Sequence, residues 1–418
     1  MPLLPPASLP QAIDQVEMRR AGRDLLSLAL MDARNHTLHL LALFETPSAG
    51  AAEHQRQALE RPLWLAGHVA WLAESWIGRN PQRHRGAQCP SDAIRLASIE
   101  PLADGWYDPA LAPPESHWQM ALPGFQAVRS FLLETLESTL ELLEKAREDD
   151  DGLYFFRAAL FHEDLRGEQF ITLAQALGLP CKLPLPAAMP PREALLVPAG
   201  RWMLGSAPGG FVFDVEQWAH AVDVLEFEID AQPVSWAQYV EFAGDGGYDS
   251  PDYWHPDGWT WLQAQLQEGR RGPRHVEQIG NASGAVIQTL FGRPTRMSAS
   301  QPAMHVSWWE ADAWCRWAGR RLPAEVEWEL AAHVAARRGF RWGDVHEWTA
   351  GLLRPWPGFA PDPWTRHTDL EAQPQFGRAR VLRGASFATR ARLKNPKARR
   401  FALPERDDAF VGFRSCAV

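Results

Sequence analysis

The chain contains 418 residues, of which 46% are hydrophobic and 22% charged, and its 42 basic and 51 acidic residues give a formal net charge of −9. This length predicts two domains, because a single hydrophobic core rarely extends beyond roughly 250–300 residues. The acidic balance, without a basic run, argues against nucleic acid or an anionic membrane as a partner. No apolar span of about 18 residues and no signal-peptide pattern is present, so we expect a cytoplasmic protein.

The first part of the chain is predicted to be helical. Apolar residues recur at three- and four-residue spacing in four segments, which is typical of amphipathic helices: residues 21–45, 61–79, 123–148 and 153–179. Proline and glycine fall in the connections between these segments, and the second connection is long. We therefore predict a four-helix bundle over residues 1–185, with a topology that need not be simple up-and-down.

The composition and pattern of the sequence change between this bundle and the rest of the chain. Five prolines among residues 180–193 form a semi-rigid linker that cannot continue a helix. Beyond it the sequence contains short β-like pieces, many Gly, Pro and Trp residues, and one clear helix at 307–319. Residues 186–418 are thus predicted to form a loop-rich α+β domain, which makes the whole chain a two-domain α+β protein.

Two features of the composition bear on ligands. The four cysteines, Cys89, Cys181, Cys315 and Cys416, are far apart and form no CxxC pair, so we expect neither a zinc site nor disulfides. Twenty tryptophans against five tyrosines supply many indole faces. Most of these belong in the core, although an aromatic face is also what binds a quaternary ammonium group through cation–π attraction.

The segment ALFHEDLRGEQF carries a candidate metal ligand within a helical pattern. His162 lies on the apolar face, and a second ligand four residues later would share that face. Arg166 holds that position, and a guanidinium has no lone pair to donate to a metal. A rotation of 100° per residue directs the three neighbouring acidic side chains to other faces. The spacing alone leaves open whether this is a metal site.

Four motifs in the second half point to a known fold. They are VSWWEADAWCRWAGRRLPAEVEWELAA, HEWTAG, VLRGASFAT and the closing FVGFR. Together they resemble the formylglycine-generating-enzyme or sulfatase-modifying fold, a C-type-lectin-like domain. Behind a DinB-like helical bundle, this domain is similar to the ergothioneine-type sulfoxide synthases. The first predicted helix and the HED opening of the histidine motif look most like the selenoneine synthase branch of that family.

The resemblance implies an iron(II) site in the bundle. The family holds iron with one histidine from an early helix, which matches His68, and with two from an HxxxHxE motif, which matches HEDLRGE. His162 takes the first place of that motif, Arg166 stands where the second histidine is expected, and Glu168 would orient a ligand histidine. Two histidines plus solvent or substrate, a weakened site, or a third ligand such as His39 remain open, and we favour the first.

The resemblance also implies a substrate pocket between the two domains. In the loop RPWPGFAPDPWTRH, Trp364 and His367 stand where the family has a tyrosine pair that contacts the reacting sulfur and the substrate, and only His367 could titrate near neutrality. In a second loop the family's Asn-Trp-Asp reads Arg-Phe-Ala. Arg400 could pair with a carboxylate and Phe401 could contact a trimethylammonium group. The indoles of Trp356 and Trp364 suit stacking on a sugar, with plain loop packing as the alternative.

We therefore expect an iron(II)- and O2-dependent oxidoreductase. It would join a selenosugar to C2 of the imidazole of hercynine (N,N,N-trimethylhistidine) and yield a selenoxide. One alternative is a sulfoxide synthase that uses γ-glutamylcysteine or cysteine. Another is a metal-free betaine-binding protein with a decayed site, which Arg166 keeps open. A formylglycine-generating oxidase is set aside, because such an enzyme needs a close cysteine pair near the C-terminus and only Cys416 is there.

Overall fold

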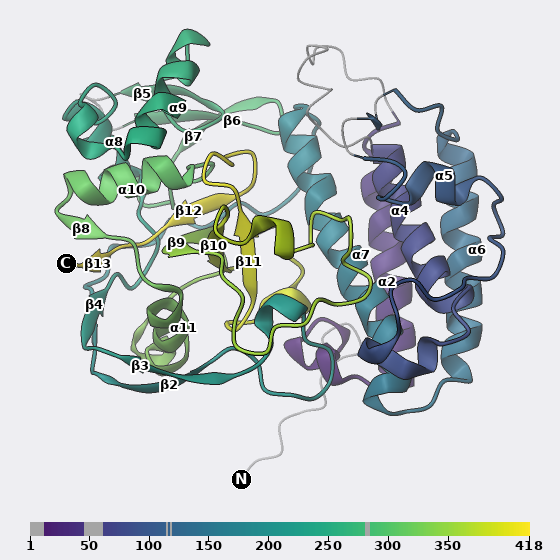
Figure 1. The fold of residues 1–418 in the computed structure, drawn as a ribbon. Helices are drawn as coiled ribbons and strands as arrows, with labels where there is room; N and C mark the ends of the chain where they lie inside the picture. The colour runs from purple at the N-terminus through teal and green to yellow at the C-terminus, as the bar shows by residue number, and fades with distance from the viewer. Residues whose placement is uncertain (1–11, 46–61, 114–115, 118, 281–284) are drawn as a thin grey trace.

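The structure of the chain is a computed structural model, which describes residues 12–45, 62–113, 116–117, 119–280 and 285–418. Long helices make up the N-terminal part, and short strands with further helices make up the rest (Figure 1). The mixed architecture of helices and strands that the sequence predicts is therefore confirmed.

The N-terminal part is built from the helices that the apolar periodicity predicts. Each predicted segment overlaps one long helix: α2 (Arg23–Ala42), α4 (Pro62–Ala73), α6 (Phe125–Glu144) and α7 (Asp150–Ala176). Shorter helical elements accompany them: η1 (Val16–Arg20) precedes α2, and the π-helical η2 (Glu74–Gly78), η3 (Arg83–Gln88) and α5 (Ala103–Tyr107) lie between α4 and α6. The long helices pack on one another, whereas the specific likeness to a DinB bundle stays a prediction.

The C-terminal part contains several small sheets. Two are four-stranded, with the orders β1-β4-β13-β8 and β11-β10-β9-β12, and they accompany a hairpin of β2 and β3 and a meander of β5, β6 and β7. Only β9 and β12 pair in parallel among these strands. The strands are β1 (Leu195–Val197), β2 (Gly200–Leu204), β3 (His220–Val224), β4 (Phe227–Ile229), β5 (Val276–Gly280), β6 (Ala285–Leu290), β7 (Arg293–Met297), β8 (Arg320–Arg321), β9 (His346–Leu352), β10 (Arg380–Gly384), β11 (Arg399–Ala402), β12 (Val411–Phe413) and β13 (Cys416–Ala417).

Helices cover these sheets. They are α8 (Trp236–Gly244), α9 (Pro256–Gln267), α10 (Trp308–Trp317) and α11 (Glu325–Val334), with 3-10 turns η5 (Asp214–Glu216), η6 (Pro251–Tyr253), η7 (Ala336–Arg338), η8 (Gln373–Gln375) and η9 (Ala391–Leu393). The predicted helix at 307–319 is α10, which begins with a capping box of Ser307 and Glu310. The other helices were not predicted, although Ser235 and Gln238 form the same box at the start of α8.

The proline-rich segment 180–193 contains neither helix nor strand, as predicted. It leads from the end of α7 to β1. The placement of a domain boundary at residue 185 stays a prediction.

Helix α7 is the element on which the two parts of the chain meet (Figure 1). Buried residues follow almost its whole length, because α2 and α4 pack on one side and the strand-rich part on the other. Asp164 accepts two hydrogen bonds from Arg392 of η9, at 2.6 and 2.8 Å. The Tyr154 hydroxyl donates to Asp362 at 2.7 Å. Polar side chains of α7 thereby fix its position against the C-terminal part.

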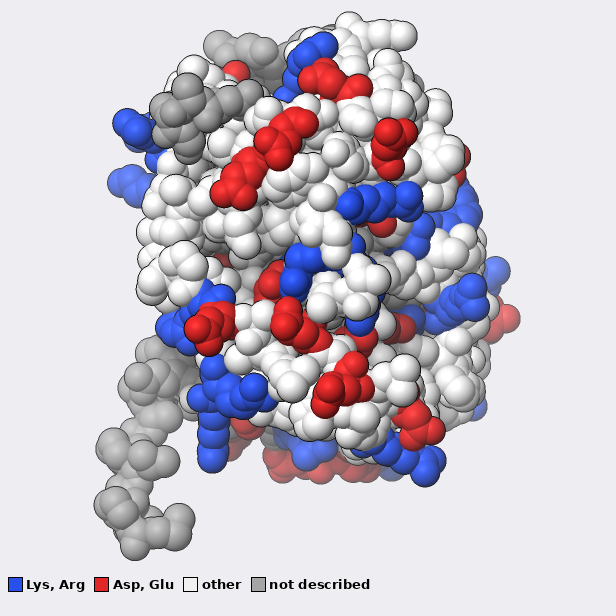
Figure 2. Space-filling view, turned by 90° about the vertical axis from the view of Figure 1, so that its left-hand side faces the viewer, with Lys and Arg blue, Asp and Glu red and all other residues white. Residues whose placement is uncertain are grey.

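The charged side chains on one face of the molecule are mixed in sign (Figure 2). On the strand-rich face in Figure 2, basic and acidic side chains are interspersed rather than gathered by sign. In the described part of the chain, no helix combines the length and the apolar character needed to cross a membrane.

Candidate functional site

Two histidines from separate helices lie side by side inside the helical part. The ring centroids of His68 on α4 and His162 on α7 are 5.2 Å apart, and the rings meet edge to face. Both side chains are buried. The Nδ1–H group of His68 donates to the carbonyl of Tyr107 at 2.9 Å, which leaves a lone pair on Nε2. Among the described residues, that Nε2 atom has no hydrogen-bond partner.

Burial keeps both imidazoles neutral. It lowers the pKa of His68 to about 3 and the pKa of His162 well below the usual range, and the Arg166 guanidinium lowers both further. A neutral imidazole offers a lone pair to a metal or to a hydrogen-bond donor. The structure thus brings the two predicted ligand histidines together, and their role as ligands stays a prediction.

Arg166 engages the lone pair of His162. It lies one turn further along α7 on the same face, and its Nε–H donates to Nε2 of His162 at 2.9 Å. The other guanidinium nitrogens donate to the side chains of Gln169 at 2.6 Å and Asp369 at 2.7 Å. The lone pair that a neutral His162 can offer is therefore hydrogen bonded to a cation of the chain itself.

As they are arranged, the described side chains do not fit a three-ligand iron site. Glu163 and Asp164 each pair with a buried arginine, in line with their predicted directions around the helix. His39 is exposed on α2, so the structure removes it as a third ligand. Within the described ranges, no group of three or more His, Cys, Asp or Glu side chains is placed to hold a metal ion. The chain offers two histidines, one of them engaged by Arg166.

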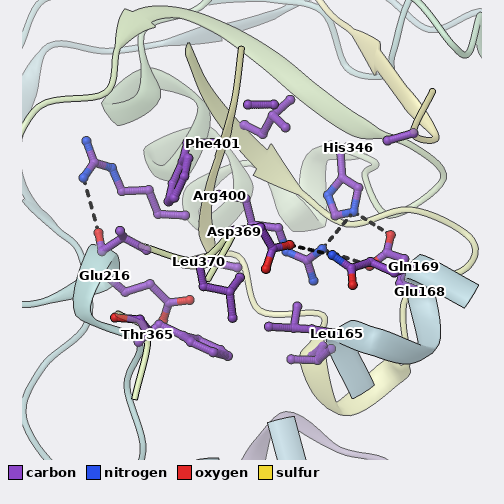
Figure 3. A pocket seen from close by; sticks show the side chains of 18 of the residues that line it. Leu165, Glu168, Gln169, Glu216, His346, Thr365, Asp369, Leu370, Arg400 and Phe401 are labelled. Carbon is purple, nitrogen blue, oxygen red and sulfur yellow. Dashed lines mark hydrogen bonds and ion pairs between the residues drawn. The ribbon is translucent and has the colours of Figure 1, made fainter. Parts of the chain in front are cut away.

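A cavity of about 150 Å³ opens where α7 faces β11 (Figure 3). Leu165, Glu168 and Gln169 line it from α7, and Arg400 and Phe401 line it from β11. Arg400 and Phe401, predicted to bind substrate, thus lie in a cavity between the two parts of the chain. The other titratable side chains in its wall are Arg19, Arg166, Asp214, Glu216, His346, Asp369, Arg399 and Arg406.

Glu168 is the centre of a buried polar cluster in this wall. Its Oε1 accepts from Nε2 of His346 at 2.7 Å and from two hydroxyl groups after β10 at 2.6 and 3.0 Å, and its Oε2 accepts from Arg400 at 2.9 Å. Burial alone would raise the pKa of Glu168, but His346 and Arg400 hold it well below its usual range. The carboxylate therefore orients residues of the C-terminal part, and not the histidines of α4 or α7 that it was predicted to orient.

Of the three site residues predicted in the loop after β9, only Trp364 lies beside the histidine pair. Trp364 is buried, and its ring meets the His162 ring edge-on with 6.0 Å between centroids. His367 is exposed and lies outside the cavity wall, so the structure does not bring it to the histidine pair. Trp356 also lies outside the wall and stacks on the guanidinium of Arg399 at 4.3 Å, which is the loop-packing alternative.

A pair of buried carboxyl groups connects the cavity wall to Trp364. Asp214 and Asp362 each accept a hydrogen bond from the other's backbone N–H, at 3.0 and 3.1 Å. The Tyr154 hydroxyl donates to Asp362 and accepts from the Trp364 indole at 3.2 Å. Burial raises the pKa of Asp214 to about 6 and that of Asp362 well above its usual range. The carboxyl groups of this pair therefore bind a proton more tightly than exposed ones do.

Comparisons with known proteins place this arrangement in a family. A family model described as Sulfatase-modifying factor enzyme 1-like domain matches residues 182–344. The proteins named hercynine oxygenase in Mycolicibacterium smegmatis and Mycobacterium tuberculosis are each 31% identical to the chain, over 94% and 86% of it and over 98% and 92% of their own lengths. The chain belongs to the hercynine oxygenase family. The formylglycine-generating enzyme of Streptomyces coelicolor is 31% identical over 38% of the chain and 54% of its own length.

Membership of the hercynine oxygenase family makes the chain an oxidoreductase. It confirms, at the level of the family, the resemblance to ergothioneine-type sulfoxide synthases that the motifs indicated, and it confirms the sulfatase-modifying domain. The narrower prediction of a selenoneine synthase stays a prediction.

Sequence reasoning missed most of the polar partners in the cavity wall. His346 stands in HEWTAG, but that motif served only to identify the fold, and its histidine is the signal that could have been followed. Asp214 and Asp362 are 148 residues apart in loops, and nothing in their spacing links them. Tyr154 lies in an apolar helical pattern that indicated core packing.

Proposed function

We propose that this oxidoreductase joins a selenosugar to C2 of the hercynine imidazole with O2 as the oxidant. The C2–H bond and the Se–H bond break and a C–Se bond forms, while one oxygen atom becomes the selenoxide oxygen and the other leaves as water. Of the four electrons that O2 takes up, two come from forming the C–Se bond and two from oxidising selenium. The relationship to hercynine oxygenases over nearly the whole chain is the observation that carries this proposal.

The cavity wall offers binding groups for hercynine. Phe401, half-buried in the wall, supplies an aromatic face for the trimethylammonium group. Among the described side chains, Arg400 uses only Nη1 in hydrogen bonds. Its Nε and Nη2 groups are therefore available to a substrate carboxylate, which a guanidinium binds well in a two-point contact. Glu168 would hold Arg400 in place from the opposite wall.

The charges of the wall favour a donor without an ammonium group. Glu168, Glu216 and Asp369 are each already paired with an arginine, at distances from 2.5 to 2.9 Å. The remaining carboxyl group of the wall, Asp214, accepts hydrogen bonds from two backbone N–H groups and from the Thr365 hydroxyl. Ala402 also lines the cavity, at the place where the family has an acid for the amino group of its thiol donor. A sugar selenol needs hydrogen-bonding groups instead of a free carboxylate, and this supports the selenosugar over γ-glutamylcysteine or cysteine.

Iron(II) stays the proposed cofactor, with His68 and His162 as the ligands that the chain offers. Because Arg166 engages His162 in the structure, iron can bind there only after that hydrogen bond breaks. Hercynine binding through Phe401 and Arg400 does not depend on that event, so it can be measured separately.

The test supplies the purified protein with hercynine, iron(II) and O2, and adds the selenosugar, γ-glutamylcysteine or cysteine in turn. We expect a selenoxide by mass spectrometry with the selenosugar, and one O2 consumed per product. Product from a thiol donor alone would replace this proposal by the sulfoxide synthase. Hercynine binding in calorimetry without turnover on any donor would favour the betaine-binding alternative, and no binding at all would refute the substrate.

A pair of variants tests the hercynine site. Phe401→Leu is expected to weaken hercynine binding roughly 2- to 30-fold, since a cation–π contact contributes about 0.5–2 kcal/mol. Phe359→Leu is the matched control, because Phe359 is a half-buried phenylalanine that packs on Phe376 with 5.2 Å between centroids and lies outside the cavity wall. Equal losses in both variants would point to general packing and would remove Phe401 from the site.

A further inference from the structure

The hydrogen bond from Arg166 to His162 places a guanidinium where the family resemblance predicts a metal ion. A neutral imidazole has one lone pair to offer a metal, and in His162 that lone pair, on Nε2, accepts from Nε of Arg166 at 2.9 Å. An imidazole nitrogen has one lone pair, so it cannot serve the guanidinium and a metal at the same time. Binding of a metal therefore requires Arg166 to leave His162.

Arg166 is held firmly in this position. Its side chain is 2% exposed, and its two terminal nitrogens donate to Asp369 and Gln169. The amide of Gln169 in turn donates to the second oxygen of Asp369 at 2.5 Å (Figure 3). With the two bonds from Arg166, this contact closes a ring of hydrogen bonds that fixes the guanidinium. The negative charge of Asp369 also balances the charge of Arg166, and a planar guanidinium loses little freedom on binding such a fork.

His68 has a nitrogen that could bind a metal, because its Nε2 lone pair is not used by any described residue. The Nε2 atom of His68 is buried and lacks a hydrogen-bond partner among the described residues, and its ring lies 5.2 Å from that of His162. A divalent ion there would replace one unsatisfied atom by a metal bond. It would also lie close to the positive charge of Arg166, in a buried site where screening by water is weak.

We propose that Arg166, held by Asp369 and Gln169, competes with a metal ion for His162 and thereby sets the metal affinity of the chain. This inference rests on the proposed function only for the identity of the metal, because the competition follows from the geometry. The residue one turn after His162, here Arg166, then determines whether the site binds a metal ion or a guanidinium.

The experiment titrates the full chain with Co(II), a surrogate for iron(II) whose visible absorption reports coordination, and confirms the affinity by calorimetry. Wild type is expected to bind weakly. Arg166→Gln removes the charge and should bind at least 10-fold more tightly, and Arg166→His adds a ligand and should bind at least 100-fold more tightly. Arg166→Lys keeps the charge and should gain less than Arg166→Gln.

Two controls locate the effect. Arg157→Gln changes another buried arginine of α7, one that bonds Asp150 and a backbone carbonyl away from the histidine pair, and should leave Co(II) affinity unchanged. Adding His162→Ala to Arg166→His should abolish the gain. Circular dichroism checks that each variant is folded, and the charge-neutral Arg166→Gln keeps the test decisive if the histidine variant does not fold.

The proposal is overturned if wild type binds Co(II) within threefold of Arg166→Gln, or if the gain survives the loss of His162. Neither measurement needs substrate or turnover. If the wild-type protein makes product and also binds Co(II) tightly, the proposed function is upheld and the competition is refuted. If the variants show the expected Co(II) affinities but the wild-type protein makes no product, the competition is upheld and the proposed function is refuted.

Discussion

The buried ion pair between α7 and η9 predicts that its two residues are strongly coupled. Arg392 is fully buried, and Asp164 is its main partner through two hydrogen bonds. Asp164→Leu leaves the guanidinium with Asp32, a carboxylate about one-third exposed at 2.9 Å. An unpaired buried charge typically costs about 3–5 kcal/mol. Because Asp32 compensates in part, we expect the free energy of unfolding to fall by about 3 kcal/mol.

Removing the arginine instead, in Arg392→Met, should lower the free energy of unfolding by less. Burial already raises the pKa of Asp164 although Arg392 opposes it, so in Arg392→Met the carboxyl group can take up a proton and become neutral. We expect a loss of about 2 kcal/mol. The double variant Asp164→Leu/Arg392→Met removes both charges together, and Asp32 keeps an ion pair with Arg390. Because no unpaired buried charge remains, its stability should lie within about 1–2 kcal/mol of wild type.

Urea denaturation followed by tryptophan fluorescence measures all four proteins, and the double-mutant cycle gives a coupling energy. We expect the coupling to be about 3 kcal/mol. If the losses of the single variants simply add in the double variant, the two side chains are not coupled, and the account of α7 as the element that fixes the two parts of the chain is wrong.

Two further predictions concern the cavity wall. The pKa of Asp214 is raised in the folded state to about 6 from an ordinary value of 3.8. Between these two pKa values the folded protein binds a proton at Asp214 that the unfolded chain does not, so the free energy of unfolding falls as pH rises from about 4 to about 6. Relative to Asp214→Asn, wild type should lose up to about 3 kcal/mol over this interval. Urea denaturation at pH 4 and pH 7 measures this difference. Glu168→Gln leaves Arg400 without its carboxylate and should lower the free energy of unfolding by about 2 kcal/mol, whereas the exposed control Glu141→Gln should be neutral; equal effects would contradict a special role for Glu168.

The helices of the first part could be predicted because their signal is local. Apolar residues at helical spacing placed α2, α6 and α7 to within about four residues of their observed ends, whereas the segment predicted at 61–79 divides into α4 and the π-helical η2. The short strands and the helices α8, α9 and α11 were harder, since their burial is imposed by partners far away in sequence. Local signals were limited to helix starts, such as the capping box of Ser235 at α8 and Pro256 at the first position of α9.

The candidate site divides in the same way. His68 and His162 could be singled out from their motifs, and the shared face of His162 and Arg166 follows from their four-residue spacing. The contacts of Glu168 with His346 and Arg400 span 178 and 232 residues. They depend on how α7 docks against β9 and β11, which no periodicity encodes.

The position of α7 has a consequence for how ligands enter. One side of this helix presents His162 to the interior of the bundle, and another presents Glu168 to the cavity, while Asp164 anchors it to η9. Pulling the two halves of the protein apart would strip charged groups of their partners, so hinge opening is a costly route for substrate. Substrate should instead reach the cavity while the two parts stay docked. Exchange of wall residues such as Leu370 and Phe401 could then change what is admitted without disturbing the scaffold.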